Sequence, residues 1–399
     1  MSEICFLVGS VGISGGTYVI FQHAHYLQTK GFKVTLAVQE PFGPATYAWH
    51  PYASNLTLIN FEEAKQRVFD LVIATWWKTA LELAQFHAER YAYFVQSIES
   101  RFYPEYEQPL RRLVDATYQF GVAYVTEVDW IRQHLLDHHG QQAAVVRNGI
   151  RKDLYHADMA RSDTQQELRV VVEGPFRVKF KNVGRTIQLV KKAGVTDITL
   201  LTSSPVSWIP GVNRLYSRVP ITAVPGIYQS CDVLVKLSSV EGMFGPPLEM
   251  FHCGGTAVVY DVSGYDEYIC HEGNALVAAM GDEDAVVAHI RRLMRDRDLL
   301  RELRVNAALT AQGWPSWEQS SEQFHEWTVA MLNQAGHDRA AIEALTAAAW
   351  RDYVRDEAIR LQGTPKPLMR HRMAALARRL PAPAVKFIEN ATAVYEVLH

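Results

Sequence analysis

Short apolar runs rich in strand-forming residues recur along the chain, and longer helical stretches separate them. Examples are EICFLVG at 3–9, FDLVIATWW at 69–77, RVVVEGP at 169–175 and CDVLVKLSS at 231–239. Apolar runs of this length are typical of strands buried on both faces of a parallel sheet, with helices as the crossover connections. The alternation predicts an α/β protein.

The length of 399 residues is sufficient for two domains. We place a linker in the polar stretch ADMARSDTQQEL at 157–168, because a new series of strands begins directly after it. The resulting expectation is an N-terminal domain over 1–156, a C-terminal domain over 157–332 and a helical tail over 333–399.

Composition and charge argue against a nucleic-acid-binding, a disulfide-bonded secreted or a membrane-spanning protein. A net charge of −3 provides no electrostatic argument for nucleic-acid binding. Four cysteines occur without a C-x-x-C pair or a His/Cys cluster, which favours reduced thiols in a cytoplasmic protein. The apolar start carries Glu3 and no basic segment, so it is expected to be a first strand and not a signal peptide. No apolar run approaches the ~18 residues of a membrane span.

The most unusual stretch is SSVEGMFGPPLEMFHCGGTAVVY at 238–260, where Glu241 and Glu249 stand eight positions apart with Gly and Pro between them. Proline is tolerated in the first turn of a helix. We therefore expect Glu241 to end a loop and Glu249 to lie in the first turn of a helix that starts near Pro246–Pro247.

A helix N-terminus binds anions through its free N–H groups, whereas carboxylates accept hydrogen bonds from hydroxyls. This combination suits a ligand that is part phosphate and part polyol, such as a nucleotide sugar. The alternative is an ordinary loop, helix and strand with acidic residues at the helix N-terminus.

The same stretch resembles the signature of retaining glycosyltransferases of family 4, E-G-F-G-x-P-x-x-E followed by C-G and a strand. Here it is Glu241-Gly-Met-Phe-Gly-Pro-Pro-Leu-Glu249, then Cys253-Gly254 and TAVVY. The resemblance extends over roughly 4–332. It implies the GT-B fold, in which two Rossmann-like domains face each other across a cleft.

The family implies roles for matching residues. Glu249 would bind the ribose of the donor and Glu241 the hydroxyls of the transferred sugar. The backbone of Met243, Phe244 and Gly245 would contact the donor diphosphate.

Two further segments match the family's diphosphate-binding motifs. In FRVKFKN, Arg177 and Lys181 are the nearest matches to the family cations, and Lys179 competes for either role. In the loop GSVGISGG, Gly15 and Gly16 match a Gly-Gly pair that lets the backbone approach the diphosphate. Alternatively, the cations of FRVKFKN are solvated surface charges, and GSVGISGG is only a flexible strand–helix loop.

Acceptor-side candidates follow two apolar runs of the N-terminal half. Trp76 and Trp77 would stack on a sugar or a lipid-linked acceptor, or else pack in the core or between domains. Gln96 occupies the place of a family histidine and cannot carry a proton, so that role is unfilled. Glu99 is a nearby polar candidate.

The resemblance implies transfer of a sugar from a nucleotide diphosphate sugar to a hydroxyl of a glycan or lipid-linked acceptor, with retention, in cell-surface polysaccharide biosynthesis. The reaction that the resemblance implies requires no metal and no cofactor. Two alternatives stay open: a nucleotide-sugar epimerase or hydrolase on the same fold, and a non-catalytic scaffold of a polysaccharide-assembly complex.

The tail is basic between Ala358 and Ile388, where seven Lys and Arg residues occur without an acid. It either contacts the inner face of a membrane, docks on the N-terminal domain or binds a protein partner.

Overall fold

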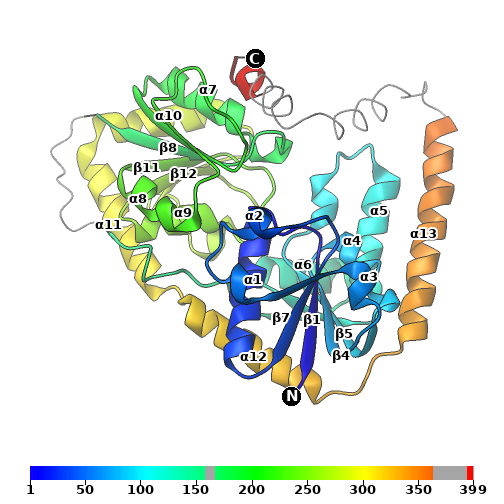
Figure 1. The fold of residues 1–399 in the computed structure, drawn as a ribbon. Helices are drawn as coiled ribbons and strands as arrows, with labels where there is room; N and C mark the ends of the chain where they lie inside the picture. The colour runs from blue at the N-terminus through cyan, green and yellow to red at the C-terminus, as the bar shows by residue number, and fades with distance from the viewer. Residues whose placement is uncertain (158–166, 363–392, 399) are drawn as a thin grey trace. The chain divides into compact units, whose positions relative to one another are not determined.

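The computed structural model describes residues 1–157, 167–362 and 393–398. It contains two compact units (Figure 1). Unit 1 comprises Met1–Gly149 and Pro315–Lys366, and unit 2 comprises Ile150–Trp314 and Pro367–His399. This division differs from the expected boundaries, because the first unit ends at Gly149 and not at residue 156, and residues 315–332 belong to unit 1.

Unit 1 is built on a seven-stranded sheet in the order β3-β2-β1-β4-β5-β6-β7, in which every pairing is parallel. Its strands are β1 (Glu3–Val8), β2 (Lys33–Val38), β3 (Thr57–Asn60), β4 (Val68–Ala74), β5 (His87–Val95), β6 (Ala123–Thr126) and β7 (Ala143–Val145). Its helices are α1 (Gly15–Thr29), α2 (Pro44–Tyr47), α3 (Phe61–Ala64), α4 (Trp77–Ala80), α5 (Gln108–Ala116), α6 (Asp129–His139), α12 (Trp317–Leu332) and α13 (Arg339–Gln362).

Helix α12 belongs to unit 1 because its apolar face is buried against α1 and the sheet. Phe324 is fully buried and its ring stacks on that of His23 at a centroid distance of 4.3 Å. His23 Nδ1 lies 3.1 Å from Ser321 Oγ. Burial lowers the pKa of His23 to about 3, so this ring is a neutral core group at physiological pH.

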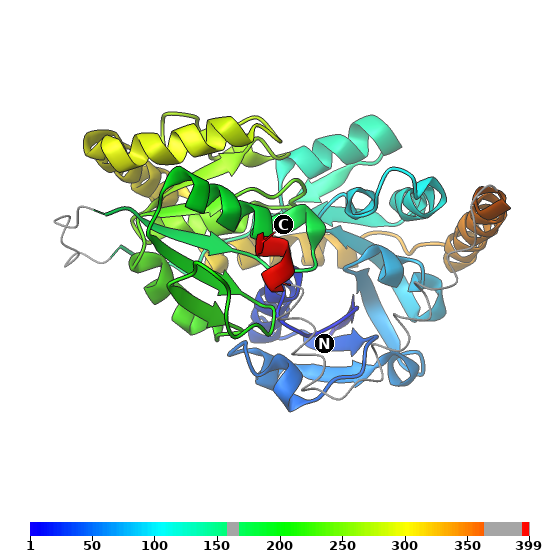
Figure 2. The ribbon, with the colours of Figure 1, turned by 90° about the horizontal axis from the view of Figure 1, so that it is seen from above.

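Unit 2 has a six-stranded parallel sheet in the order β10-β9-β8-β11-β12-β13. Its strands are β8 (Arg169–Glu173), β9 (Asp197–Thr202), β10 (Arg214–Ser217), β11 (Val233–Lys236), β12 (Thr256–Tyr260) and β13 (Leu276–Ala278). Its helices, seen with the sheet in Figure 2, are α7 (Val183–Ala193), α8 (Val224–Gln229), α9 (Gly245–His252), α10 (Glu283–Arg295) and α11 (Arg297–Gly313).

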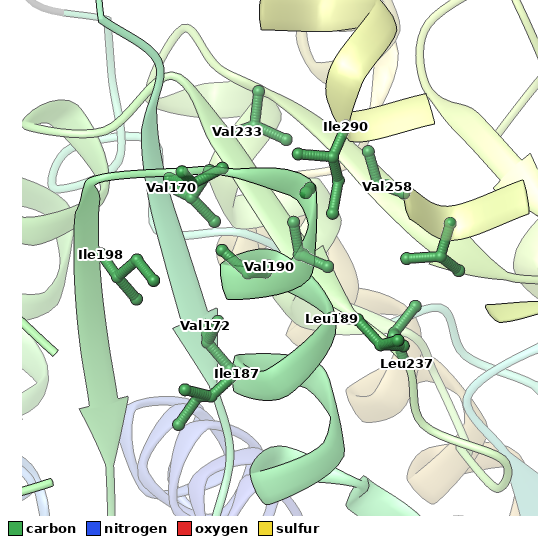
Figure 3. Packing of buried hydrophobic residues seen from close by; sticks show 14 of the residues in the cluster. Val170, Val172, Ile187, Leu189, Val190, Ile198, Val233, Leu237, Val258 and Ile290 are labelled. Atoms are coloured by element: carbon green, nitrogen blue, oxygen red, sulfur yellow. The ribbon is translucent and has the colours of Figure 1, made fainter. Parts of the chain in front are cut away.

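One face of the unit 2 sheet packs on α7 and α10 (Figure 3). Val172 of β8, Ile187 of α7 and Ile290 of α10 are among the buried side chains of this core. The C-terminal helical turn 393–398 adds Ala393 and Val397 to the same cluster. Within the basic segment 358–388, residues 363–388 lie outside the described residues.

Each sheet has one position where the chain order reverses. In unit 1 it lies between β1 and β4, and in unit 2 between β8 and β11. Ligands of open α/β sheets bind at the carboxyl ends of the strands at such positions. None of the helices in the described part of the chain is both long and apolar enough to cross a membrane.

Candidate functional site

The reversal point of unit 2 carries an ion pair between a buried lysine and a partly exposed glutamate. Glu173 is the last residue of β8 and Lys236 the last residue of β11. Lys236 Nζ lies 2.5 Å from Glu173 Oε2, and the Lys236 side chain is only 3% exposed. The sequence analysis missed both residues, although the signal was present: a charged residue ends each of the apolar runs VVVE and VLVK.

Glu241 lies between two lysines. Its Oε2 is 2.6 Å from Lys181 Nζ, and its Oε1 is 3.7 Å from Lys236 Nζ. Burial alone would raise the pKa of Glu241, but the two lysine charges outweigh that effect and hold its pKa below the usual value. Glu241 is therefore ionised at neutral pH, as its predicted role requires.

The loop that carries Lys181 is bonded to the end of β11. Asn182 Nδ2 donates to Leu237 O at 2.8 Å, and Ser239 N donates to Phe180 O at 2.8 Å. At the start of the loop, Gly174 has a φ of +144°, and a Cβ there would lie 2.9 Å from Val183 Cγ2. The loop geometry thus requires glycine at 174 and brings Lys181 to Glu241.

Glu249 is the fifth residue of α9, so the expectation that it lies in the first turn was wrong. The helix begins earlier, at Gly245, with both prolines in its first turn. Burial, reinforced by the negative charge of Glu173, raises the pKa of Glu249 to about 7. The hydroxyls of Tyr155 and Tyr228 act in the opposite direction. Neither tyrosine was recognised from the sequence, because both lie far from Glu249 along the chain.

The turn 243–245 is held in place by burial and by hydrogen bonds within unit 2. Phe244 is 1% exposed, and its carbonyl accepts a hydrogen bond from Tyr268 Oη. The Gly245 N–H donates to Met243 O at 2.9 Å, so this amide is engaged in the turn. The predicted diphosphate contact would therefore have to come from the other amides of the turn.

Arg177 and Lys179 are exposed on the same loop as Lys181. Arg177 has a φ of +68°. Burial raises the pKa of Glu396 in the C-terminal turn, and the Arg177 backbone and both cations oppose that shift. The two cations are thus close to a carboxylate of this chain.

In unit 1 the glycine-rich loop after β1 leads into α1. Ser14 caps the helix by accepting from Thr17 N at 3.1 Å. Gly15 is exposed, and a Cβ at Gly16 would lie 3.1 Å from Gln96 Oε1. Gly16 and Gln96, both predicted site residues, therefore lie together at the reversal point of this sheet.

The other acceptor-side candidates differ in exposure and in hydrogen bonding. Trp77 is 4% exposed, which agrees with the core-packing alternative, whereas Trp76 is partly exposed. Glu99 Oε2 accepts from Trp77 N at 2.7 Å and from Tyr93 Oη at 2.5 Å. Burial raises the pKa of Glu99 to about 8. Trp77 and Glu99 therefore support the fold around Trp76.

The part of the chain that the structure describes contains no group of three or more His, Cys, Asp or Glu side chains arranged to hold a metal ion. The absence of a metal from the mechanism stays a prediction.

Comparison with known proteins supports a glycosyltransferase. The family model "Glycosyl transferases group 1" matches residues 213–310, which include Lys236, Glu241 and Glu249. The O-antigen biosynthesis protein RfbC of Myxococcus xanthus is 25% identical over 285 residues, which is 69% of this chain. The alignment covers 22% of RfbC, so the chain spans about a fifth of the length of that relative.

Solved structures show the fold. Anabaena HepE, solved with UDP and glucose, superposes with a TM-score of 0.66 at 14% identity and covers 83% of this chain and 100% of its own. Sucrose-phosphate synthase of Thermosynechococcus elongatus gives a TM-score of 0.63 at 16% identity, over 82% of this chain and 99% of its own. These similarities confirm the predicted fold class, two Rossmann-like domains of the GT-B type.

Proposed function

We propose that this chain is a retaining glycosyltransferase that moves a sugar from a nucleoside diphosphate sugar to a hydroxyl of a glycan or lipid-linked acceptor. The observation that carries the proposal is the arrangement of Lys181, Glu241 and Glu249 at the carboxyl ends of β8 and β11 in unit 2. Two of these residues lie in the segment that matches the glycosyltransferase model.

The leaving group explains the cations. A departing nucleoside diphosphate carries negative charge that must be stabilised as the glycosidic bond breaks. Lys181, Arg177 and Lys179 belong to one short segment directly before α7, and their charges would offset it. The backbone at Gly15 and Gly16 remains a candidate for a further diphosphate contact.

The carboxylates explain the recognition of hydroxyls. Glu249 would accept hydrogen bonds from the ribose, and Glu241 from the transferred sugar, which is thereby held against the leaving group. In the retaining family that the sequence resembles, a phosphate oxygen of the donor serves as base. That scheme needs neither a protein base nor a metal, and it tolerates Gln96 where a histidine is usual.

Two of the comparisons suggest the substrates to test first. HepE has been solved with UDP-glucose as well as with UDP and glucose, which supports a UDP-sugar as the first donor. RfbC is named for O-antigen biosynthesis, which supports a cell-surface glycan as the acceptor class. Both assignments are part of the proposal.

Thermal unfolding with UDP, dTDP, GDP, ADP or CDP tests donor binding. A ligand that binds only the folded protein raises the unfolding midpoint. We expect one nucleotide to raise it in the wild type and in a Glu302→Ala control, which changes an exposed glutamate of α11. The shift should be lost in Glu249→Ala. A midpoint that no nucleotide moves would contradict donor binding and favour the scaffold alternative.

Donor turnover tests the reaction itself. We expect consumption of the nucleotide sugar to depend on an acceptor glycan and the product to keep the anomeric configuration of the donor. Consumption at the same rate without an acceptor would instead identify an epimerase or a hydrolase.

A further inference from the structure

We propose that Lys236 is a positioning residue that keeps the Glu241 carboxylate paired and oriented when Lys181 turns to the diphosphate of the donor. The inference rests on the proposed function and assigns a role to a residue outside the family pattern that the sequence displays. The two ends of strands β8 and β11 carry different arrangements of charge.

The opposite end of the same two strands carries an ordinary ion pair. Arg169 starts β8, and its Nη2 lies 3.0 Å from Oδ1 of Asp232, the residue before β11. Asp232 Oδ2 also accepts from Arg169 N at 2.9 Å and from Arg169 Nε at 3.1 Å. One cation and one carboxylate are sufficient to tie the strands together there.

At the carboxyl ends of the same strands, the Glu173–Lys236 pair has further charged neighbours. Lys236 contacts Glu173 at 2.5 Å and has a second carboxylate, that of Glu241, at 3.7 Å. Glu241 in turn contacts Lys181 at 2.6 Å. The result is a chain of alternating charges, Glu173–Lys236–Glu241–Lys181, with two negative and two positive members. A strand tie does not require Glu241 or Lys181, so the additional members suggest another role.

The two lysines differ in exposure. Lys181 is the last residue of a short 3₁₀ turn, Lys179–Lys181, and its side chain is 20% exposed, whereas Lys236 ends a strand and its side chain is 3% exposed. A buried carboxylate that loses its partner carries a large desolvation cost. If Lys181 moves its ammonium toward a diphosphate, Glu241 still has Lys236. The buried lysine would thus let the exposed lysine serve the leaving group.

The groups that face this chain of charges come from several elements. The charges of Lys181 and Lys236 and the Ser238 hydroxyl act on Glu241. The Tyr268 hydroxyl is affected by the charge of Glu241. Lys236 also experiences the charges of Glu173 and Glu249. Removing the Lys236 charge therefore raises the pKa of Glu241, and it also raises the pKa of Glu249, on which the Lys236 charge acts in the same direction. The acid limb of the activity profile should move to higher pH through both carboxylates, and the titration described below isolates Glu241.

The test uses the full chain and four variants: Lys236→Met, Lys236→Arg, the double variant Glu173→Gln/Lys236→Met, and Arg169→Met as the control at the other end of the strands. We expect Lys236→Met to lower kcat about 10-fold or more near pH 7 and to move the acid limb upward. Lys236→Arg should keep most of kcat. Arg169→Met should lower the unfolding midpoint without moving the pH profile.

The double variant separates positioning from strand pairing. It removes the ion pair as a unit, so the unfolding midpoint should recover relative to Lys236→Met while kcat measured above pH 8 stays low. Recovery of both midpoint and kcat would overturn the proposal, because Lys236 would then serve only to tie the strands. A rise in donor KM with unchanged kcat in Lys236→Met would also overturn it, because Lys236 would then contact the donor directly.

A second measurement does not depend on turnover. Titration of ¹³C-labelled glutamate carboxyl groups by NMR, with the Glu241 signal assigned by its loss in Glu241→Gln, follows the pKa of Glu241 directly. We expect it to rise in Lys236→Met, and an unchanged value would overturn the inference. If the wild type consumes no nucleotide sugar, the proposed function fails, whereas this titration still decides whether Lys236 controls Glu241.

Discussion

Lys181 Nζ lies 2.6 Å from Glu241 Oε2, although 60 positions separate the two residues. The hydrogen bonds Asn182 Nδ2 to Leu237 O and Ser239 N to Phe180 O hold the two loops together on either side of this pair. The fold itself therefore brings the two side chains into contact. A donor diphosphate would have to compete with Glu241 for the Lys181 ammonium.

Replacing Lys181 with Met should weaken UDP binding about 10-fold or more, because a charge-assisted hydrogen bond to phosphate is lost. Isothermal titration calorimetry measures the effect. Lys192→Met is a suitable control, since that lysine lies on the exposed side of α7 and pairs with Asp284 at 3.1 Å. Equal affinities of the two variants would remove Lys181 from the donor site.

Binding of UDP-glucose should strengthen as the pH rises from about 6 to about 8. Burial and the charge of Glu173 raise the pKa of Glu249 from 4.5 to about 7, and the proposed ribose contact requires the ionised form. Below that pKa each binding event must release a proton, which costs up to tenfold in affinity per pH unit. UDP-glucose is the appropriate probe because its diphosphate does not change charge in this range.

Glu249→Gln is the matched variant for this pH dependence. It should bind UDP-glucose more weakly at pH 8 and with an affinity that hardly varies with pH. If the wild type shows the same flat profile, Glu249 does not contact the ligand.

The neighbouring tryptophans of unit 1 should behave differently. Trp77→Ala should destabilise the protein by about 3–5 kcal/mol, because its side chain is almost fully buried. Trp76→Ala should have a much smaller effect on stability but should raise the KM for the acceptor while leaving the nucleotide-induced shift of the unfolding midpoint intact. Chemical denaturation and transfer assays distinguish the two, and an unchanged acceptor KM in Trp76→Ala would exclude the stacking role.

Gly184→Ala tests the packing of the C-terminal turn on α7. Alanine in a helix is normally favoured over glycine by up to ~1 kcal/mol, so helix propensity alone predicts a more stable protein. A Cβ at position 184 would, however, lie 2.5 Å from Glu396 O, and Gln188 Nε2 donates to Glu396 O and Val397 O at 3.3 and 3.2 Å. We therefore expect the unfolding midpoint to fall in the full chain.

The deletion of residues 393–399 provides the control for this variant. In that background the contact with Glu396 is gone, so Gly184→Ala should raise the midpoint or leave it unchanged. A lower midpoint in both backgrounds would show that Gly184 is required by α7 itself.

Local spacing along the chain predicted the features that depend on neighbouring residues. The apolar runs predicted strands of two parallel sheets, and the frame of glycine and proline around Glu241 and Glu249 predicted a loop that enters a helix. Both follow from backbone preferences over fewer than about ten residues. The resemblance to a glycosyltransferase signature also depends on such a short stretch.

Only the tertiary structure decided which distant residues meet. Glu173 and Lys236 become neighbours because β8 pairs with β11, three strands later in the chain. In the same way, helix α12 belongs to unit 1 because the face that contains Phe324 packs against His23. A sequence pattern shows that a residue is charged or apolar, but its partner depends on strand order and helix packing, which no local stretch encodes.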